Sequence, residues 1–411
     1  MSNSRVAPGA MMHVVCLLAL IVASLPVGAG GNSLAEAVRA LESSLAANPV
    51  AAAAGAESTA RYGEGLVAVA LEVFEQSRHL DKPYFRRGDG IDGRAGLYNP
   101  DNLYSSALVS DLGRYRVRGR RGSHVMLTLQ VLDAYPMIGL GRNLAVIDLD
   151  AMGIKSGESF ELLLGGERQP GRWVSLPFGT RALLARQTFS DWERETPTVL
   201  SIERLDRDAP RVDSTMPEHN AADYLRAVDR TWNEGYLPMI RRLPENRLPP
   251  PRVSDTGAGG LGGQQSVMAR YRLGVDQALL VTVKKSGARY QGIQLGDPWF
   301  VTPNYIDRQV SLTAAQAVTD ADGYFRFVIS LRDPGVANWL DPAGFAEGYL
   351  FMRWQGLDRP LTAAEAPVAE VVELADLAVR LPADTRRVTP EARREQLLRR
   401  QWVPIRRVAV N

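Results

Sequence analysis

Three aspartates are the residues of this chain best suited to acid–base chemistry. Asp101 lies in the polar segment Asn99–Tyr104, beside the amide of Asn102 and the phenol of Tyr104. Asp133 and Asp297 each follow an apolar run that reads as a strand. Two carboxylates on facing loops could serve as general acid and base, so these three are the candidate catalytic residues. The alternative is structural, because aspartate and asparagine also form turns at strand ends.

Aromatic and arginine side chains follow each of the two strand-ending aspartates. Rings with guanidinium groups suit a polar ring, such as a sugar or an aromatic acid, by stacking and hydrogen bonding. Loops on a rigid sheet are the usual place for such groups. The candidate ligand-binding residues are Asn102, Tyr104, Tyr135, Arg142, Trp299, Tyr305 and Arg308.

The sequence gives little support for a metal site, a nucleophilic serine or a nucleic-acid interface. His79, His124 and His219 show no metal-ligand spacing, and no Gly-x-Ser-x-Gly elbow is present. Hence no metal and no cofactor is expected. A net charge of +2 gives no reason to expect nucleic acid as a partner. The expected partner is a small molecule or glycan, and the sequence leaves the oligomeric state open.

The N-terminus resembles an export signal. The apolar stretch Met11–Leu25 follows Arg5 and precedes the small residues Val27-Gly28-Ala29. The stretch is too short for a comfortable membrane span, and it contains Cys16, the only cysteine. We expect a secretory signal peptide over residues 1–29 and a periplasmic or secreted protein, with an uncleaved N-terminal anchor as the alternative. No other membrane association is expected.

An internal duplication organises the rest of the chain. Gln130-Val131-Leu132-Asp133 matches Gln294-Leu295-Gly296-Asp297, and four further matches follow at nearly constant spacing. They are Phe160 with Phe325, Pro170-Gly171 with Pro334-Gly335, Trp173 with Trp339, and Arg186 with Arg353. The offset grows only from 164 to 167 residues, as small loop insertions would produce. Each copy therefore predicts one β-rich unit with a buried Phe and Trp.

The expected fold is mainly β, with tandem jelly-roll-like β-sandwich domains and N-terminal, inter-domain and C-terminal α-helices. Helical patterns start at Ser33, Thr59, Asn220 and Thr389. The predicted parts are a signal peptide (1–29), a helical region (30–83), a first sandwich (84–210), a helix with a Pro/Gly-rich linker (211–265), a second sandwich (266–360) and a C-terminal extension with a helix (361–411).

Two segments resemble known bacterial families. Asn99–Ser106 together with Leu129–Tyr135 resembles domain-of-unknown-function family 1254, and Arg332–Asp341 resembles its usual partner, family 1214. That second family typically shows Asn-Trp-Leu-Pro, whereas this chain has Asp341 and then Pro342. The resemblance covers roughly residues 95–205 and 270–357. It implies tandem β-sandwiches with helical decoration, often in exported proteins, and it carries no reaction.

Two function classes follow. The first is an exported protein that binds a polar or aromatic small molecule or glycan between the two sandwiches or at the mouth of one. The alternative is a cofactor-free lyase, isomerase or hydrolase that uses Asp and Tyr as acid and base. Whether the chain is an enzyme stays open at this stage.

Overall fold

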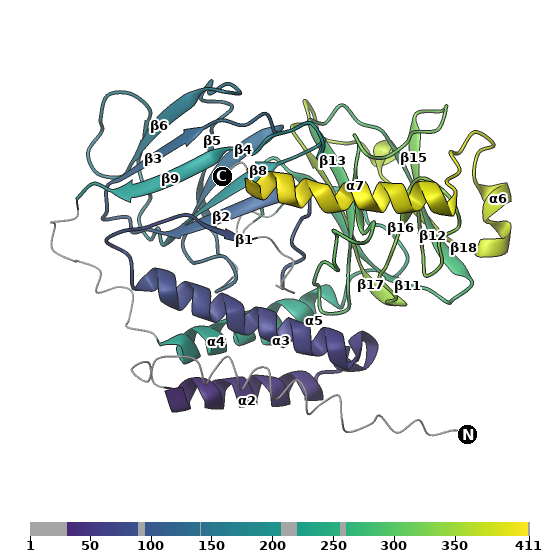
Figure 1. Ribbon diagram of the computed structural model, residues 1–411, viewed down its shortest axis with the longest axis horizontal. Coiled ribbons are helices and arrows are strands. Elements are labelled where there is room, and N and C mark those ends of the chain that lie inside the picture. Colours follow the sequence, from purple (N-terminus) through teal and green to yellow (C-terminus); the bar gives the residue numbers. More distant parts are fainter. Residues whose placement is uncertain (1–30, 89–94, 140, 207–219, 255–259, 410–411) are drawn as a thin grey trace.

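The computed structural model describes residues 31–88, 95–139, 141–206, 220–254 and 260–409. Two β-sandwiches lie side by side, a layer of helices lies beneath both, and one long helix crosses in front (Figure 1). The predicted signal peptide and residues 255–259 of the Pro/Gly-rich linker fall outside the described residues. None of the described helices is long and apolar enough to cross a membrane.

The first sandwich contains a five-stranded sheet in the order β1-β2-β8-β4-β5 and a four-stranded sheet in the order β7-β6-β3-β9. Alternate residues of the strands, such as Leu127, Leu129 and Val131 of β4, fill the core between the sheets. The strands are β1 (Arg86–Gly88), β2 (Asn102–Leu108), β3 (Tyr115–Arg120), β4 (Met126–Leu132), β5 (Asn143–Asp148), β6 (Ser159–Leu164), β7 (Trp173–Val174), β8 (Ala182–Thr188) and β9 (Val199–Arg204).

The second sandwich repeats this arrangement strand for strand. Its sheets have the orders β10-β11-β17-β13-β14 and β16-β15-β12-β18. The strands are β10 (Arg252–Val253), β11 (Gln265–Arg272), β12 (Gln277–Lys284), β13 (Tyr290–Gly296), β14 (Ser311–Thr313), β15 (Tyr324–Ser330), β16 (Trp339–Leu340), β17 (Glu347–Gln355) and β18 (Val368–Glu373). Because β18 pairs with β12, this sandwich extends beyond residue 360, where the sequence placed its end.

The matched tryptophans play the same part in both copies. Trp173 lies on β7, which pairs in parallel with β6, and Trp339 lies on β16, which pairs in parallel with β15. Each indole Nε1 donates a hydrogen bond of 3.0 Å to a backbone carbonyl at the end of the neighbouring strand, that of Gly165 or Ser330. The fold is therefore the predicted one, a tandem pair of β-sandwiches from an internal duplication.

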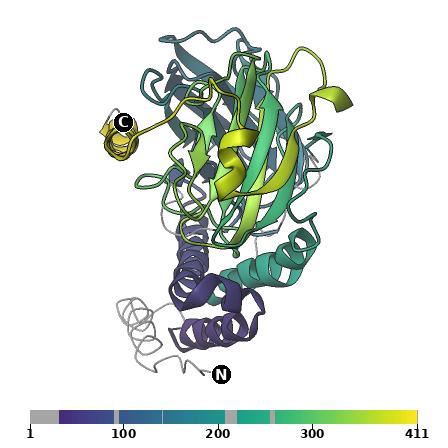
Figure 2. The ribbon, with the colours of Figure 1, turned by 90° about the vertical axis from the view of Figure 1, so that its right-hand side faces the viewer.

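The helical layer covers the outer faces of the two five-stranded sheets (Figures 1 and 2). It consists of α2 (Gly31–Ala47), α3 (Val50–Ser77), α4 (Ala221–Asp229), a π-helix η1 (Arg230–Tyr236) and α5 (Leu237–Ile240). Leu34, Val38, Leu41 and Leu45 are buried, as the helical spacing predicted. One apolar cluster joins these helices to residues of both sheets, including Leu184 and Tyr349.

Two further helices follow the second sandwich. They are α6 (Leu377–Arg380) and α7 (Pro390–Ala409). Helix α7 begins at the position that the sequence pattern predicted and continues to Ala409. Its buried Arg393 donates to both carboxylate oxygens of Asp333 and to the carbonyl of Val336, which fixes the helix against the second sandwich. From there α7 reaches across toward the first sandwich (Figure 1).

Candidate functional site

Asp101 lies at the junction of the two sandwiches and is 1% exposed. Its Oδ1 accepts a hydrogen bond of 2.9 Å from Trp192 Nε1, and its Oδ2 accepts one of 2.7 Å from Tyr290 Oη. Asn99 forms the turn that places it, because Asn99 Oδ1 accepts from the backbone N–H of Asp101. Burial and the charge of Asp101 raise the pKa of Tyr290 well above its usual range, so this phenol stays a donor.

Trp192 connects this buried cluster to α7. The guanidinium carbon of Arg400 lies 4.6 Å from the centre of the Trp192 ring, and the Tyr305 ring meets that ring edge-on at 6.1 Å. Arg400 is held in place by bonds to the carbonyls of Tyr305 and Ser311. The predicted residues Asp101 and Tyr305 thus meet through Trp192, which the sequence reading did not select.

A hollow of about 330 Å³ opens beside Trp192, and we call it the seam hollow. Its walls come from the connector after β8, from the second sandwich and from α7, so it lies between the duplicated units. Its size falls in the range of small-molecule sites. The lining residues are Asp191, Trp192, Glu193, Arg194, Leu312, Ala315, Gln316, Gln396, Arg399 and Arg400.

Of the charged side chains around the seam hollow, some have partners within the protein and others are available to a ligand. Asp191 is engaged by the backbone N–H groups of Glu193 and Arg194 and lies 3.7 Å from the Arg194 guanidinium. Among the described residues, Arg399 has no acidic group at ion-pair distance. Gln396 is already bonded to Gln309 and Arg393. The hollow therefore presents an aromatic wall and an available guanidinium, which suits a ligand with a carboxylate.

The matched aspartates Asp133 and Asp297 both close loops. Asp133 Oδ1 accepts from the N–H of Arg142 and its own N–H donates to the Arg142 carbonyl. Asp297 makes the same pair of bonds with Val301. The turn-forming interpretation of these two residues thus describes what both carboxylates do in the fold.

Asp297 differs from Asp133 in its burial beneath α3. Its Oδ2 accepts a hydrogen bond of 2.8 Å from Ser58 Oγ, and its Oδ1 accepts from the N–H groups of Trp299 and Val301. Burial raises the pKa of Asp297 from 3.8 to about 6, although these three hydrogen bonds act in the opposite direction. The carboxyl group of Asp297, one of the three predicted aspartates, therefore changes its charge near neutral pH.

The aromatic residues predicted on the loops are packed under the helices. Trp299 is fully buried, stacks on Tyr62 at 4.6 Å and donates to Thr59. Tyr135 is 6% exposed, and its hydroxyl donates to the buried Glu72 at 2.5 Å. Both were expected on open excursions. The structure places them under α3 instead, because α3 covers the sheet faces from which these loops leave.

The remaining predicted residues are distributed over the surface and the junction. Arg142 pairs with Asp133 at 2.7 Å and Arg308 with Asp341 at 2.8 Å, both on exposed loops. Asn102 donates to the hydroxyl of Tyr104 within β2. Arg142 and Arg308 therefore lie apart from Asp101 and Tyr305, whereas Tyr104 is linked to Tyr305 through the ring of Tyr98, at 4.9 Å and 6.5 Å.

Arg186 and Arg353, which the duplication relates, also lie at the junction. The Arg186 guanidinium lies 5.3 Å from the centre of the Tyr104 ring, and that of Arg353 lies 3.6 Å from the ring of Phe351. Burial lowers the pKa of both arginines from the usual value. Arg353 also donates to Gln294, the matched glutamine of β13. The repeated arginines thus serve the packing of the two outer sheet faces.

The three predicted carboxylates do not share one site. Asp101 Oδ2 would lie 2.9 Å from a Cβ on Gly292, whereas Asp297 follows Gly296 at the end of the same strand. Four residues of strand separate those glycines by about 13 Å. Asp133 lies on the other sandwich with its own partner, Arg142. Among the described residues, no group of three or more His, Cys, Asp or Glu could hold a metal ion.

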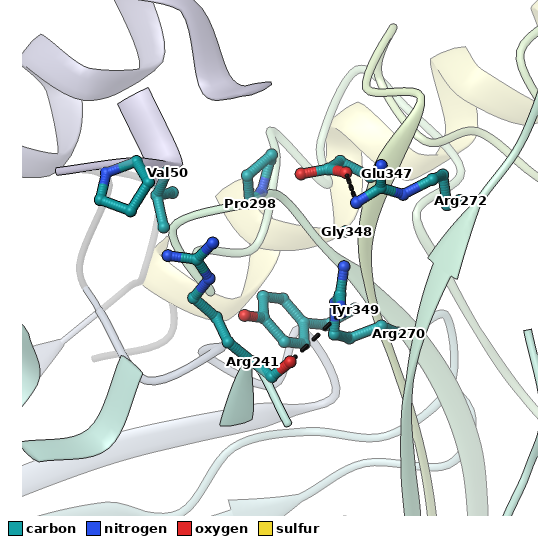
Figure 3. Close-up of a pocket in the computed structure, with 9 residues that line it drawn as sticks. Val50, Arg241, Arg270, Arg272, Pro298, Glu347, Gly348 and Tyr349 are labelled. Atoms are coloured by element: carbon teal, nitrogen blue, oxygen red, sulfur yellow. Dashed lines mark hydrogen bonds and ion pairs between the residues drawn. The ribbon is translucent and has the colours of Figure 1, made fainter. Parts of the chain in front are cut away.

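A smaller pocket of about 40 Å³ lies where the helical layer meets the second sandwich (Figure 3). Arg241, Arg270 and Arg272 surround Tyr349 there, and Arg272 pairs with Glu347 at 2.7 Å. Burial raises the pKa of Tyr349 to about 12, although the two nearest guanidiniums lower it. A space this small holds a water or a single small ion. The residues around it join the helical layer to the second sandwich.

Comparisons with known proteins support the fold and are silent on function. The chain matches no family model and no curated protein. It is similar to the crystal structure of an uncharacterized protein from Burkholderia cenocepacia, with a TM-score of 0.71 and 26% identity over 83% of this chain and 96% of that one. A Vibrio parahaemolyticus protein matches over 82% of this chain and 99% of that one, at a TM-score of 0.44 and 11% identity. The resemblance to families 1254 and 1214 stays a prediction.

Proposed function

We propose that this protein binds a polar small molecule that carries a carboxylate, such as an acidic sugar, in the seam hollow. One observation carries the proposal: all three structural parts that meet at the duplication's junction contribute walls to a hollow of about 330 Å³. Ligand sites commonly lie where domains meet. Export to the periplasm, which the N-terminal segment favours, would give the protein access to such solutes.

The chemistry of the walls supports this ligand class. Trp192 is only 4% exposed, so it supplies an apolar contact at the wall of the hollow rather than an open ring face, and its position is fixed by Asp101 and Arg400. Arg399 supplies the guanidinium fork that suits a carboxylate. The side-chain amide of Gln316 can hydrogen-bond ligand hydroxyls, because only its Oε1 is engaged, by the N–H of Thr313.

A thermal-shift screen of the full chain tests this proposal. Glucuronate and benzoate should raise the melting temperature, and glucose at the same concentration should raise it less. Arg399→Gln should lower the affinity for the acidic ligand at least tenfold. Arg394→Gln is the matched control, because Arg394 is exposed on the same helix and does not line the hollow. Equal shifts for acidic and neutral sugars, or an Arg399→Gln variant that binds normally, would refute the proposal.

Acid–base catalysis is the second candidate, and one observation favours it. Asp297 is buried with its pKa raised to about 6, the range in which a carboxyl group can act as acid or base. The cofactor-free lyase, isomerase or hydrolase that we proposed as the alternative would need a substrate to reach it beneath α3. Turnover of any ligand found in the screen, abolished in Asp297→Asn, would support this candidate. Binding without turnover would support the binding function and would count against catalysis.

Export is tested separately from ligand binding. If residues 1–29 are a cleaved signal peptide, the periplasmic fraction should contain a shortened chain, and N-terminal sequencing should place its start near Gly30. Full-length protein confined to the cytoplasm would refute export. Full-length protein in the membrane fraction would favour the N-terminal anchor.

A further inference from the structure

A second and larger hollow lies at one end of the second sandwich, and we call it the open mouth. It has a volume of about 550 Å³ and lies between the β12–β13 hairpin and the connector from β17 to β18. The lining residues are Lys284, Lys285, Ser286, Gly287, Trp354, Leu357, Asp358, Arg359, Leu361 and Glu365. This site is separate from the seam hollow and shares no lining residue with it.

The duplication provides an internal reference, because the corresponding end of the first sandwich is closed. There the β3–β4 hairpin bonds directly to the connector from β8 to β9. Thr198 Oγ1 accepts from the N–H of Gly122 and is bonded to His124 Nε2 at 2.8 Å. A Cβ on Gly122 would lie 2.2 Å from the carbonyl oxygen of Thr196. His124 itself is 1% exposed, so its ring fills this end.

Substitutions between the copies explain why the second end stays open. At the offset of 164 residues, Ala288 stands where the first copy has His124, and Gly287 stands where it has Ser123. A Cβ on Gly287 would meet nothing within 4 Å. Among the described residues, the backbone N–H of Arg289 donates to the carbonyl of Gly356 at 3.3 Å at the base of the hairpin, and no hydrogen bond joins hairpin residues 284–288 to connector residues 357–365. With Ala288 in place of a histidine, this end of the second sandwich has open space where the first sandwich has a packed side chain.

The connector that forms the far wall is rigid. Arg359 makes two bonds of 2.8 Å to the two carboxylate oxygens of Glu365. Glu365 also accepts from the N–H and hydroxyl of Thr362. The N–H of Leu361 donates to Gln265 of β11. The polar groups of this connector are therefore already hydrogen-bonded within the protein. The wall that it forms keeps its shape without a ligand.

The surfaces of the open mouth combine an apolar base with cations at the rim. Trp354, Leu357 and Leu361 belong to the core of the second sandwich or pack against it. Lys284 and Lys285 are exposed, and neither has a carboxylate at ion-pair distance among the described residues. They are two of only four lysines in a chain with 48 basic residues. An apolar base with two free ammonium groups matches a ligand with an apolar body and an anionic head.

We propose that the open mouth binds an amphiphilic carboxylate, whose ring or short acyl chain lies on the half-buried Leu357 and Leu361, above the buried Trp354, and whose head meets Lys284 and Lys285. A volume of about 550 Å³ accommodates such a molecule. This inference adds a second ligand class to the proposed function, because the seam hollow is lined mainly by polar groups and the open mouth has an apolar base. In the first copy the corresponding position is filled by His124.

Calorimetric titration of the full chain with octanoate, and with octanol as its uncharged analogue, tests this proposal. Octanoate should bind saturably at the open mouth. Changing Lys284 and Lys285 together to Gln should weaken octanoate at least tenfold and leave octanol within twofold. Ala288→His should abolish binding of both, because it introduces the side chain that closes the first mouth. Lys155→Gln and Arg394→Gln, two exposed cations that line neither hollow, should change neither.

Each other outcome overturns the proposal. No saturable octanoate binding would mean that the open mouth is not a site for this class. Unchanged octanoate affinity in the double lysine variant would show that Lys284 and Lys285 do not bind the anionic head. Binding that survives Ala288→His in a variant with an unchanged melting temperature would place the ligand elsewhere.

Discussion

Replacement of Asp297 by Asn should make this protein more stable at neutral pH. The carboxyl group is 5% exposed and its pKa rises from 3.8 to about 6 on folding. Asn keeps the acceptor for the N–H groups of Trp299 and Val301, and its Nδ2 can donate to Ser58 Oγ. The variant therefore keeps the loop and removes the buried negative charge.

The sign follows from proton binding. Below about pH 4 the carboxyl group is protonated in both the folded and the unfolded chain. Between about pH 4 and pH 6 the folded chain holds the proton more tightly, so this group's contribution to stability falls as pH rises. Above about pH 6 the loss is complete. A rise of about two pKa units corresponds to about 3 kcal/mol, since one unit is worth 1.36 kcal/mol.

Urea unfolding, followed by tryptophan fluorescence, measures this effect at about pH 4 and about pH 7.5. The difference in unfolding free energy between Asp297→Asn and the wild type should increase by about 3 kcal/mol from the lower to the higher pH. Asp133→Asn is the matched control from the first copy. It loses an ion pair with the exposed Arg142, so it should cost no more than about 1 kcal/mol and gain nothing at pH 7.5. A difference for Asp297→Asn that does not change with pH would refute the reasoning.

Three further predictions concern packing and can be checked by the same unfolding assay. Gly292→Ala should destabilise by about 1–3 kcal/mol, because its Cβ would lie 2.4 Å from Tyr290 Oη and 2.9 Å from Asp101 Oδ2. Gly287→Ala, with open space around the added Cβ, is its control and should be neutral. Trp339→Ala should cost about 3–5 kcal/mol and Trp173→Ala less, because Trp173 is only half-buried; equal costs would contradict this. Arg121→Ala should cost about 1–3 kcal/mol, because it leaves the carbonyls of Gly122 and His124 without their buried donor while Asp150 keeps its pair with Arg289, and no measurable cost would contradict that role.

The sequence predicted the tandem fold because the repeated residues are those that the fold needs. Phe160 and Phe325 are both buried, and Trp173 and Trp339 make the same bond to the end of the neighbouring strand. Strands β2 and β11 were harder to find. Both carry small and polar residues such as Ser106 and Gln265, and nearly all of their residues are buried or half-buried, so neither strand shows an apolar face opposite a fully exposed polar one.

The candidate site was predicted only in part. Asp101 and Tyr305 were selected and lie at the seam, but Trp192 joins them from the β8–β9 connector, and the corresponding β17–β18 connector contains no tryptophan. A single tryptophan in a polar connector gives no periodic signal. The burial of Asp297 and Tyr135 depends on α3, whose placement over two distant sheets follows from long-range packing that no local pattern encodes.

The central claim is that the seam hollow between the duplicated sandwiches binds a small carboxylate. A crystal structure of the full chain with the best acidic ligand of the thermal-shift screen tests it most directly. The account predicts the ligand's ring beside Trp192 and its carboxylate within hydrogen-bond distance of Arg399. An ordered ligand bound elsewhere, with the seam hollow empty, would contradict it.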